Sequence, residues 1–431
     1  MKQILVVTAL VVSLGLSINA CAANHDLPGN ILEQPISPEQ AQGDEKLYLE
    51  RVMGTAERMR SQPRDGGYDP LVPVAGAPDW QALPQATRDQ RTISAETLAD
   101  VEAYAQAGKS NVLIVWRKGR VELARYWNDF SVKEPMISYS LAKPVSAVAV
   151  GRAILKGSVD SLTQPVADFL PEWQGTERAG ILMRHLLDMR SGLLPQDNAQ
   201  EPGNILLRAY LHPRHEEIII NRYPLTHVPG SRYEYNNATA ELVSPVIERA
   251  TGQRYENWVS EQVLKPIGAL GGTIWLNRPD GVAHSGCCVL LPAETYLRLA
   301  ILLMQDGVWE GERLLPEGYV NTMRTATPQN PWAGMGVYVA GKYVARRGAA
   351  NPEIAMGKTL HSEPYLAEDL FLFDGNNNQA VHIVPSEQLI VLRLGSRPPK
   401  EPEWDNAYLP NTLIRGIIRG PGETAPTPQP R

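Results

Sequence analysis

The spacing of hydrophobic and polar residues differs between the two ends of the chain and its middle. Near the N-terminus, two β-rich runs flank Lys118-Gly119, a typical hairpin connection. Near the C-terminus, Pro385-Ser386 joins two more such runs. Most of residues 160–330 instead carry apolar residues at helical spacing. We therefore expect an α+β fold. One antiparallel sheet, built from N- and C-terminal segments, is flanked by helices, and a mainly helical region is inserted at about 160–330.

Two more segments carry helical signals. Ser94 is a candidate N-cap, and Glu96 lies in the first turn that follows it. Residues 139–155, YSLAKPVSAVAVGRAIL, are small and apolar on nearly every side, so we expect a buried helix there. Lys143 lies near the start of that segment, and a lysine at the start of a buried helix calls for a reason.

Composition divides the chain into parts. Residues 24–94 are rich in Pro, Gly, Asp and Gln and show weak periodicity, which predicts an extended or loosely packed lead-in. The ordered domain is expected over residues 95–418, and the Pro-rich residues 419–431 are expected to form a disordered tail.

The overall composition is that of a globular protein, and its charge argues against nucleic acid as a partner. Of the 431 residues, 43% are hydrophobic and 20% are charged, which is the usual balance for a globular chain. The net charge is −6 at pH 7, so no basic surface is indicated and nucleic acid is not expected as a partner.

Residues 1–23 predict export. Lys2 precedes an apolar stretch that ends at Leu16, and small and polar residues follow, in the order of a secretory signal peptide. The sequence INAC, which ends at Cys21, resembles a bacterial lipoprotein signal and implies a lipid on Cys21 and membrane attachment. Ordinary cleavage around residues 20–23 is the alternative. Either way we expect an exported protein, periplasmic or anchored in the envelope as a lipoprotein.

The other cysteines and a histidine pair do not indicate a metal site. Adjacent cysteines rarely satisfy disulfide geometry, so Cys287 and Cys288 are expected to be two buried thiols in a tight turn. His212 and His215 flank Pro213 in the wrong order for a zinc-protease helix, and we expect a surface loop or lid there. No metal and no organic cofactor is expected.

A hydroxyl and an amine lie one helical turn apart in residues 139–155. Ser140 and Lys143 are three positions apart, so in a helix their side chains share a face. Burial among Ala and Val penalises the ammonium form, so the amine could take the serine proton. The helix N-terminus adds backbone N–H groups for an oxyanion. A capping serine beside a lysine that extends to solvent is the structural alternative.

This segment resembles the active-site region of the serine β-lactamase and penicillin-binding-protein superfamily, in which Ser-x-x-Lys supplies nucleophile and base. Further motifs follow in the family's order: a helix that ends in Ser191-Gly192, and Tyr-x-Asn at Tyr235 and Asn237. The signature is most similar to the branch of class C β-lactamases, esterases and 6-aminohexanoate-oligomer hydrolases. The resemblance covers about residues 95–397.

The resemblance implies roles for the second motif. A phenol beside an ammonium is favoured as phenolate, so Tyr235 could take the proton of Ser140 or protonate a leaving group. Asn237 could hydrogen-bond both Lys143 and a substrate amide. The structural alternative is a buried tyrosine next to a helix N-cap at Asn236 or Asn237.

The third motif departs from most relatives. Asn376-Asn377-Asn378 stands where they place Lys-Thr-Gly or His-x-Gly, so the cation is missing. The 6-aminohexanoate-oligomer hydrolase branch has Gly-x-x-Gly-Gln, which is close to residues 375–379 here. Asparagine tolerates positive φ better than most residues. We therefore expect a backbone N–H of Asn378 or Gln379 to be the second oxyanion donor.

The missing cation argues against penicillin-like substrates. We expect a serine hydrolase that cleaves an ester or amide bond of a small molecule through an acyl-enzyme on Ser140, with Lys143 and Tyr235 as the other catalytic residues. Two alternatives stay open. One is a penicillin-binding protein or β-lactamase, and the other is a catalytically inactive, β-lactamase-like envelope protein that only binds.

Overall fold

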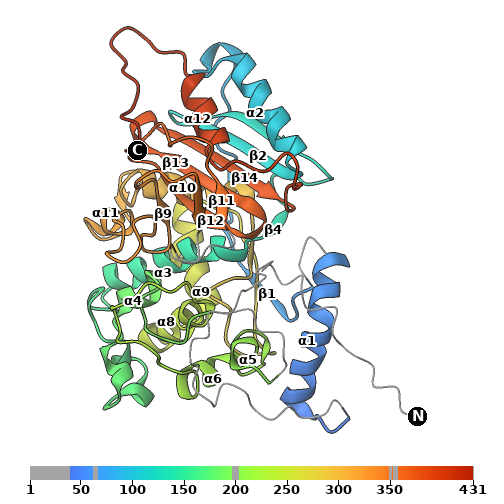
Figure 1. The fold of residues 1–431 in the computed structure, drawn as a ribbon, viewed down its shortest axis with the longest axis vertical. Coiled ribbons are helices and arrows are strands. Elements are labelled where there is room, and N and C mark those ends of the chain that lie inside the picture. The colour runs from blue at the N-terminus through green and yellow to red at the C-terminus, as the bar shows by residue number, and fades with distance from the viewer. Residues whose placement is uncertain (1–38, 62–66, 197–202, 349–351, 353–357, 431) are drawn as a thin grey trace.

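A six-stranded antiparallel sheet lies between two layers of helices (Figure 1). The computed structural model describes residues 39–61, 67–196, 203–348, 352 and 358–430. Strands from both ends of the chain meet where β2 pairs with β14, as the sequence predicts. The strand order is β3-β2-β14-β13-β12-β9, with β2 at Ser110–Arg117, β3 at Arg120–Tyr126, β9 at Tyr338–Val339, β12 at Phe371–Gly375, β13 at Gln379–Val384 and β14 at Leu389–Gly395.

Each face of this sheet buries its own core. Along β14, Leu389 and Val391 pack with α2 (Ala95–Ala107) and α12 (Tyr408–Arg415), while Ile390 and Leu392 belong to the larger core with α3 (Ala142–Leu155) and α10 (Ala293–Met304). Side chains alternate between faces along a strand, so a strand buried on both sides is apolar throughout. This explains the continuous apolar run of β14.

The predicted hairpins and the first cap are confirmed. Lys118 and Gly119 connect β2 to β3, and a short turn at Pro385–Glu387 connects β13 to β14. The side chain of Ser94 accepts a hydrogen bond from the N–H of Thr97 and caps α2.

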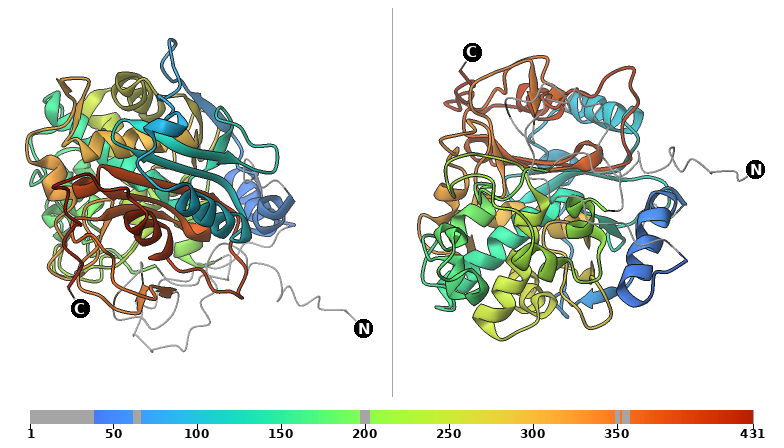
Figure 2. Two further views of the ribbon diagram at one scale, coloured as in Figure 1. Left: turned by 90° about the horizontal axis from the view of Figure 1, so that it is seen from above. Right: turned by 60° about the horizontal axis from the view of Figure 1, so that its bottom comes forward.

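The inserted region is largely helical but also contributes to a second sheet. Its strand order is β1-β5-β6-β4, with β1 at Leu71–Val74, β4 at Pro135–Ile137, β5 at Gly272–Trp275 and β6 at Val289–Pro292. The helices of the region below the main sheet are α4 (Met183–Leu187), α5 (Ile205–Leu211), α6 (His215–Asn221), α7 (Asn237–Glu241), α8 (Val243–Thr251) and α9 (Tyr255–Trp258) (Figures 1 and 2).

The expectation of an extended or loosely packed lead-in over residues 24–94 is wrong for Gly43–Ser61, whereas residues 67–94 are mostly irregular or extended. Residues Gly43–Ser61 form α1, which packs beside the inserted helices (Figure 1). Tyr48 and Val52 are buried in a cluster with Leu211. The guanidinium of Arg51 donates to the carbonyls of Leu211 and Asn277 at 3.1 and 2.7 Å. The pair Tyr48 and Val52 has helical spacing, but the Pro- and Gly-rich residues that follow conceal it.

The C-terminal tail is also more ordered than expected. Within 419–430 there is no helix or strand, but Gln429 is buried and its side-chain amide donates to the carbonyl of Ala340 at 2.7 Å. The N–H of Glu368 donates to the carbonyl of Thr427 at 2.8 Å. Hydrogen bonds to segments far away in the sequence leave no hydrophobic periodicity, so this order could not be predicted from the tail's own residues.

Two local expectations in the inserted region need correction. Cys287 and Cys288 are joined as a vicinal disulfide, not two thiols; Cys288 adopts φ 69°, an unusual backbone conformation that accompanies the bridge. The segment of His212 and His215 is not a surface loop, because both histidines are buried and His215 begins α6. Pro213 precedes that helix and so does not interrupt it.

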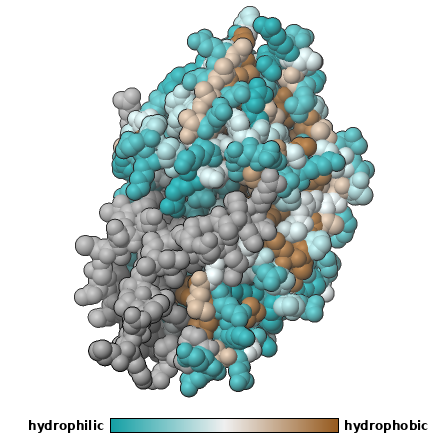
Figure 3. Space-filling model, turned by 90° about the vertical axis from the view of Figure 1, so that its right-hand side faces the viewer, coloured by the Kyte–Doolittle hydropathy of each residue, from teal (hydrophilic) through white to brown (hydrophobic). Residues whose placement is uncertain are grey.

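On one face of the molecule, the described residues that Figure 3 colours are mainly hydrophilic, with small hydrophobic areas between them. Among the described residues, no helix is both long and apolar enough to cross a bilayer. The predicted signal segment and Cys21 lie outside the described residues.

Candidate active site

Ser140 lies in a strained turn that leads into a buried helix. Residues Tyr139–Leu141 form a short 3₁₀ turn, and α3 begins at Ala142. Tyr139 has φ 46°, which is rare for a bulky residue and costs of the order of 1–3 kcal/mol. The N–H of Leu141 bonds the carbonyl of Ser138 at 3.1 Å and closes the turn. The Ser140 side chain is thereby presented at the start of α3, as the sequence predicts.

Lys143 lies one turn into α3 and is 8% exposed. Its Nζ donates to Ser140 Oγ at 3.3 Å, to Asn237 Oδ1 at 2.9 Å and to the carbonyl oxygen of Gly286 at 2.8 Å. An ammonium group has three N–H donors, so these contacts can use all of them. The amine is therefore held in one position beside the serine hydroxyl.

Tyr235 completes the contact with Ser140. Its hydroxyl lies 2.5 Å from Ser140 Oγ, and Lys143 Nζ lies 4.7 Å from the centroid of its ring. The N–H of Glu234 bonds the carbonyl of Met189 at 2.9 Å, which fixes the strand-like segment next to Tyr235. The structure thus brings together the three residues that the sequence analysis selected as catalytic.

Asn236 and Asn237 each take one of the two roles that the sequence left open, helix N-cap and partner of Lys143. Asn236 is the N-cap of α7: its side chain accepts from Thr239 N–H and donates to the carbonyl of Leu194 at 2.5 Å. Asn237 accepts from Lys143, and its N–H donates to Gln196 Oε1 at 3.0 Å. Asn236 therefore caps α7, and the carboxamide of Asn237 belongs to the candidate active site.

The Asn376-Asn377-Asn378 segment forms a tight turn beside Ser140. Asn377 and Asn378 have φ 66° and 57°, a left-handed conformation that asparagine tolerates. Asn377 Nδ2 donates to the hydroxyl of Tyr139 at 3.3 Å, and its carbonyl accepts from Arg393 at 2.6 Å. A Cβ at Gly375 would lie 3.0 Å from the carbonyl oxygen of Ser138. The segment therefore packs directly against the turn that carries Ser140.

The side chain of Gln379 serves the fold. It is 2% exposed, donates to the carbonyl of Ile137 at 2.9 Å and accepts from the N–H of Gly395 at 3.3 Å. The Gln379 side chain is therefore engaged by the fold, and the role of a backbone N–H of Asn378 or Gln379 as oxyanion donor stays a prediction.

Two contributors to the site were not found from the sequence. The carbonyl of Gly286 holds Lys143, and Glu241 lies behind it, fully buried. Burial raises the pKa of Glu241, while His215, the Gly286 backbone and Lys143 act to lower it. A backbone carbonyl has no residue signature, and Glu241 falls on an otherwise apolar helix face, so only the three-dimensional structure reveals them.

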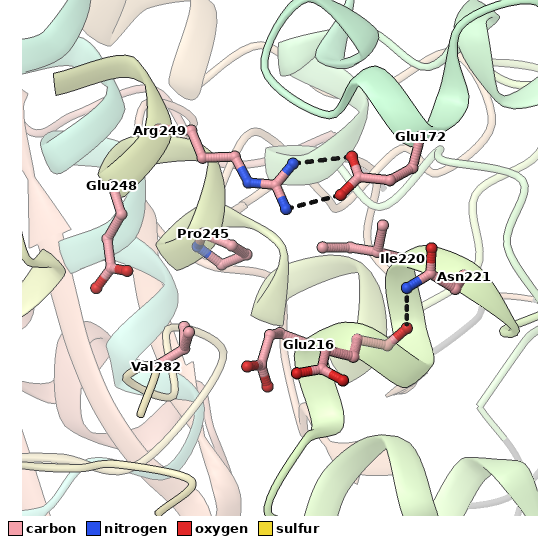
Figure 4. A pocket seen from close by; sticks show the side chains of 9 residues that line it. Glu172, Glu216, Ile220, Asn221, Pro245, Glu248, Arg249 and Val282 are labelled. Atoms are coloured by element: carbon pink, nitrogen blue, oxygen red, sulfur yellow. Dashed lines mark hydrogen bonds and ion pairs between the residues drawn. The ribbon is translucent and has the colours of Figure 1, made fainter. Parts of the chain in front are cut away.

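A separate surface pocket lies among α6, α8 and the loop at Glu172 (Figure 4). Its volume is about 230 Å³, and Arg249 pairs there with both oxygens of Glu172 at 2.8 and 2.9 Å. None of its lining residues belongs to the Ser140 site: Glu172, Glu216, Glu217, Ile220, Asn221, Pro245, Glu248, Arg249 and Val282.

Comparison with known proteins agrees with the geometry. The profile of the family described as Beta-lactamase matches residues 98–409. The chain belongs to the beta-lactamase family. Among curated members, it is similar to a 6-aminohexanoate-dimer hydrolase of Paenarthrobacter ureafaciens, with 24% identity over 59% of this chain and 64% of that protein. It is also similar to esterase EstB of Burkholderia gladioli, with 28% identity over 48% of this chain and 54% of that protein.

Solved structures of the family share the fold. EstCE1, described as a hydrolase with promiscuous acyltransferase activity, superposes with a TM-score of 0.54 at 19% identity, covering 75% of this chain and 98% of that one. FmtA of Staphylococcus aureus gives 0.53 at 11% identity, covering 81% and 95%. The chain spans less than two thirds of the length of its curated relatives. The relatives of this chain thus include proteins described as a hydrolase and an esterase.

Proposed function

We propose that this member of the family is a serine hydrolase that cleaves an ester or amide bond of a small molecule through an acyl-enzyme on Ser140. The observation that carries the proposal is the 2.5 Å contact between Ser140 Oγ and the Tyr235 hydroxyl, with Lys143 Nζ beside both. A nucleophile and a proton acceptor in direct contact, with a fixed cation next to them, are the requirements of covalent acyl transfer.

In the first step, Ser140 Oγ forms a bond to the carbonyl carbon of the substrate. In this proposal Tyr235 takes part as the phenolate, accepts the proton of Ser140 and becomes the neutral phenol. Its oxygen is closer to Ser140 Oγ, at 2.5 Å, than Lys143 Nζ is, at 3.3 Å. Lys143 stabilises the negative charge on the phenol oxygen, because its ammonium lies over the ring and is fixed by Asn237 and Gly286. The carbonyl oxygen becomes an oxyanion held by backbone N–H groups at Ser140 and at Asn378 or Gln379.

In the second step, the bond between the carbonyl carbon and the leaving group breaks, and Tyr235 returns the proton to the leaving oxygen or nitrogen. Water then attacks the acyl-enzyme, and its proton follows the same route to Ser140 Oγ. No proton, electron or group is needed from outside the substrate, the enzyme and water.

The substrate class follows from the turn at Asn376–Asn378. No lysine, arginine or histidine occupies this turn, so it offers no cation to a substrate carboxylate. Neutral acyl groups are therefore favoured over penicillins, whose carboxylate needs a positive partner. The names of the two curated relatives, an esterase and a 6-aminohexanoate-dimer hydrolase, support an ester or an amide as the bond that is cleaved.

Steady-state assays on three substrates test the proposal. p-Nitrophenyl butyrate and the linear dimer of 6-aminohexanoate represent esters and amides, and nitrocefin represents β-lactams. We expect turnover of the ester or the amide that disappears in Ser140→Ala. Turnover of nitrocefin alone would instead favour the β-lactamase alternative, and ester turnover that survives Ser140→Ala would refute the mechanism.

We also propose that the protein is exported and attached to a membrane through Cys21. The support is the order of charge, apolar stretch and small residues in the first 23 positions. Radiolabelled palmitate should enter the wild-type protein and not Cys21→Ser. Recovery of the unprocessed N-terminus in the cytoplasm would contradict export.

A further inference from the structure

Three titratable side chains meet in the interior of the inserted region, away from solvent. His215 begins α6, Glu241 ends α7, and His284 precedes β6. Their exposed fractions are 0%, 1% and 0%. Segments far apart in the sequence thus place two imidazoles and a carboxylate in one buried cluster.

The imidazole nitrogens of this cluster form no hydrogen bond in the described part of the chain. All four ring nitrogens of His215 and His284 are buried without one, and the carboxylate of Glu241, beside the backbone of Ser285 and Gly286, has no well-aligned donor. Buried polar atoms are nearly always paired in native proteins, because leaving them unpaired costs free energy. Three such side chains that face one another therefore point to a bound group.

The separations suit coordination of one ion. His284 Nδ1 lies 3.4 Å and His215 Nε2 lies 3.8 Å from oxygens of Glu241. One ligand atom from each of the three residues lies within 4.8 Å of the others. Donors around a tetrahedral ion with bonds of about 2.1 Å are about 3.4 Å apart, so small side-chain adjustments complete the geometry.

The stacking of the two imidazole rings opens when an ion is shared. Trp275 stacks on His284 at 3.9 Å, and His284 stacks on His215 at 4.3 Å with the ring planes 11° apart. The lone pair of an imidazole nitrogen lies in the plane of its ring, so one of the two rings rotates when both nitrogens bind one ion.

The neighbouring charges are otherwise accounted for. Arg51 donates to backbone carbonyls, and Arg278 pairs with Glu216 at 3.0 Å. Glu216 also lines the acidic surface pocket of Figure 4, and its Oε2 lies 4.0 Å from His215 Nδ1.

We propose that His215, Glu241 and His284 bind one divalent transition-metal ion. Zn²⁺ is the best match to two imidazole nitrogens and one carboxylate oxygen, with water in the fourth position. Hard cations such as Mg²⁺ and Ca²⁺ prefer oxygen ligands throughout. The ion joins α6, α7 and the segment before β6 directly behind Gly286, since a Cβ on Gly286 would lie 3.0 Å from Glu241 Oε1.

Zinc binding to the untagged, EDTA-stripped protein tests this directly. After dialysis against Zn²⁺ and removal of free metal, elemental analysis should find about one zinc per chain. His284→Gln should bind Zn²⁺ at least about a hundredfold more weakly. His382→Gln, which removes another buried histidine outside the cluster, should bind like wild type. A wild-type stoichiometry below about 0.1, or equal affinity in His284→Gln, would overturn the site.

X-ray absorption at the zinc edge provides a second measurement that needs no variant, should His284→Gln fail to fold. The wild-type spectrum should show two imidazole ligands with oxygen neighbours. Sulfur ligands from Cys287 or Cys288, or oxygen neighbours alone, would overturn the proposal. The inference is independent of the proposed hydrolysis, since Ser140→Ala should bind zinc like wild type.

Discussion

The hydroxyl of Tyr235 lies 2.5 Å from that of Ser140, although the two residues are 95 positions apart in the chain. Tyr235 precedes α7, and Ser140 precedes α3, so two helix starts converge on one point. The alignment is maintained from both sides by the Asn236 cap and the turn at Tyr139. This contact gives the first prediction.

Tyr235→Phe should lower kcat on the preferred substrate by about 10²- to 10⁴-fold, because it removes the group that accepts the Ser140 proton. The melting temperature should stay close to that of wild type, since the ring still packs. Tyr408→Phe is the matched control: it removes a hydroxyl that bonds only Asp100 on the surface. Unchanged kcat in Tyr235→Phe would assign proton transfer to another group.

Lys143→Ala should reduce kcat by about a thousandfold or more, because it removes the cation beside the phenol and the serine. Circular dichroism should show a folded protein. Lys265→Ala, at an exposed lysine paired with Glu261, should leave turnover unchanged. Equal activity of the Lys143→Ala and Lys265→Ala variants would show that the lysine serves only the fold.

Substitution of Asn237 should affect catalysis, whereas substitution of Asn236 should affect stability. Asn237→Ala should lower kcat by about ten- to a hundredfold, the value of a hydrogen bond to a charged group. Asn236→Ala should lower the free energy of unfolding by about 1 kcal/mol through loss of the α7 cap. Urea denaturation and steady-state kinetics on both variants check this. The assignment fails if Asn236→Ala is the one that loses activity while remaining stable.

Acid should destabilise the protein partly through His382 on β13. Burial, aided by His361 and Arg347, lowers the pKa of His382 to about 3. Between pH 6.5 and about 3 the unfolded chain binds a proton that the native state does not. Its contribution to stability is therefore present above pH 6.5 and is lost as the pH falls, by up to about 1.4 kcal/mol per pH unit.

His382→Gln tests that contribution. The variant should show a shallower fall in the free energy of unfolding between pH 6.5 and 4.5 than wild type, measured by urea denaturation at each pH. Identical pH dependence in the two proteins would mean that His382 is protonated in the native state.

Much of the fold and part of the candidate site could be predicted from local patterns in the sequence. The double-sided apolar run of β14, the Lys118-Gly119 turn and the Ser94 cap depend on neighbours in sequence, so they could be predicted. Ser140 and Lys143 could be selected from their spacing of three residues, and Tyr235 could be selected from the resemblance to the family's second motif.

Features that depend on distant backbone could not be predicted. The Gly286 carbonyl, the docking of Gln429 and the packing of α1 against Leu211 each pair segments that share no local signal. The cluster of His215, Glu241 and His284 is of the same kind, because its members come from three separate segments that share no local signal.

Intact-protein mass spectrometry with a fluorophosphonate tests the central claim most directly. The reagent reacts with an activated serine hydroxyl and adds a fixed mass. The account predicts one adduct per chain, located on Ser140 by peptide mapping, with none in Ser140→Ala and slow labelling in Tyr235→Phe. A wild-type protein that stays unlabelled by this reagent and by activated esters, or that is labelled at another residue, would contradict it and favour a protein that only binds.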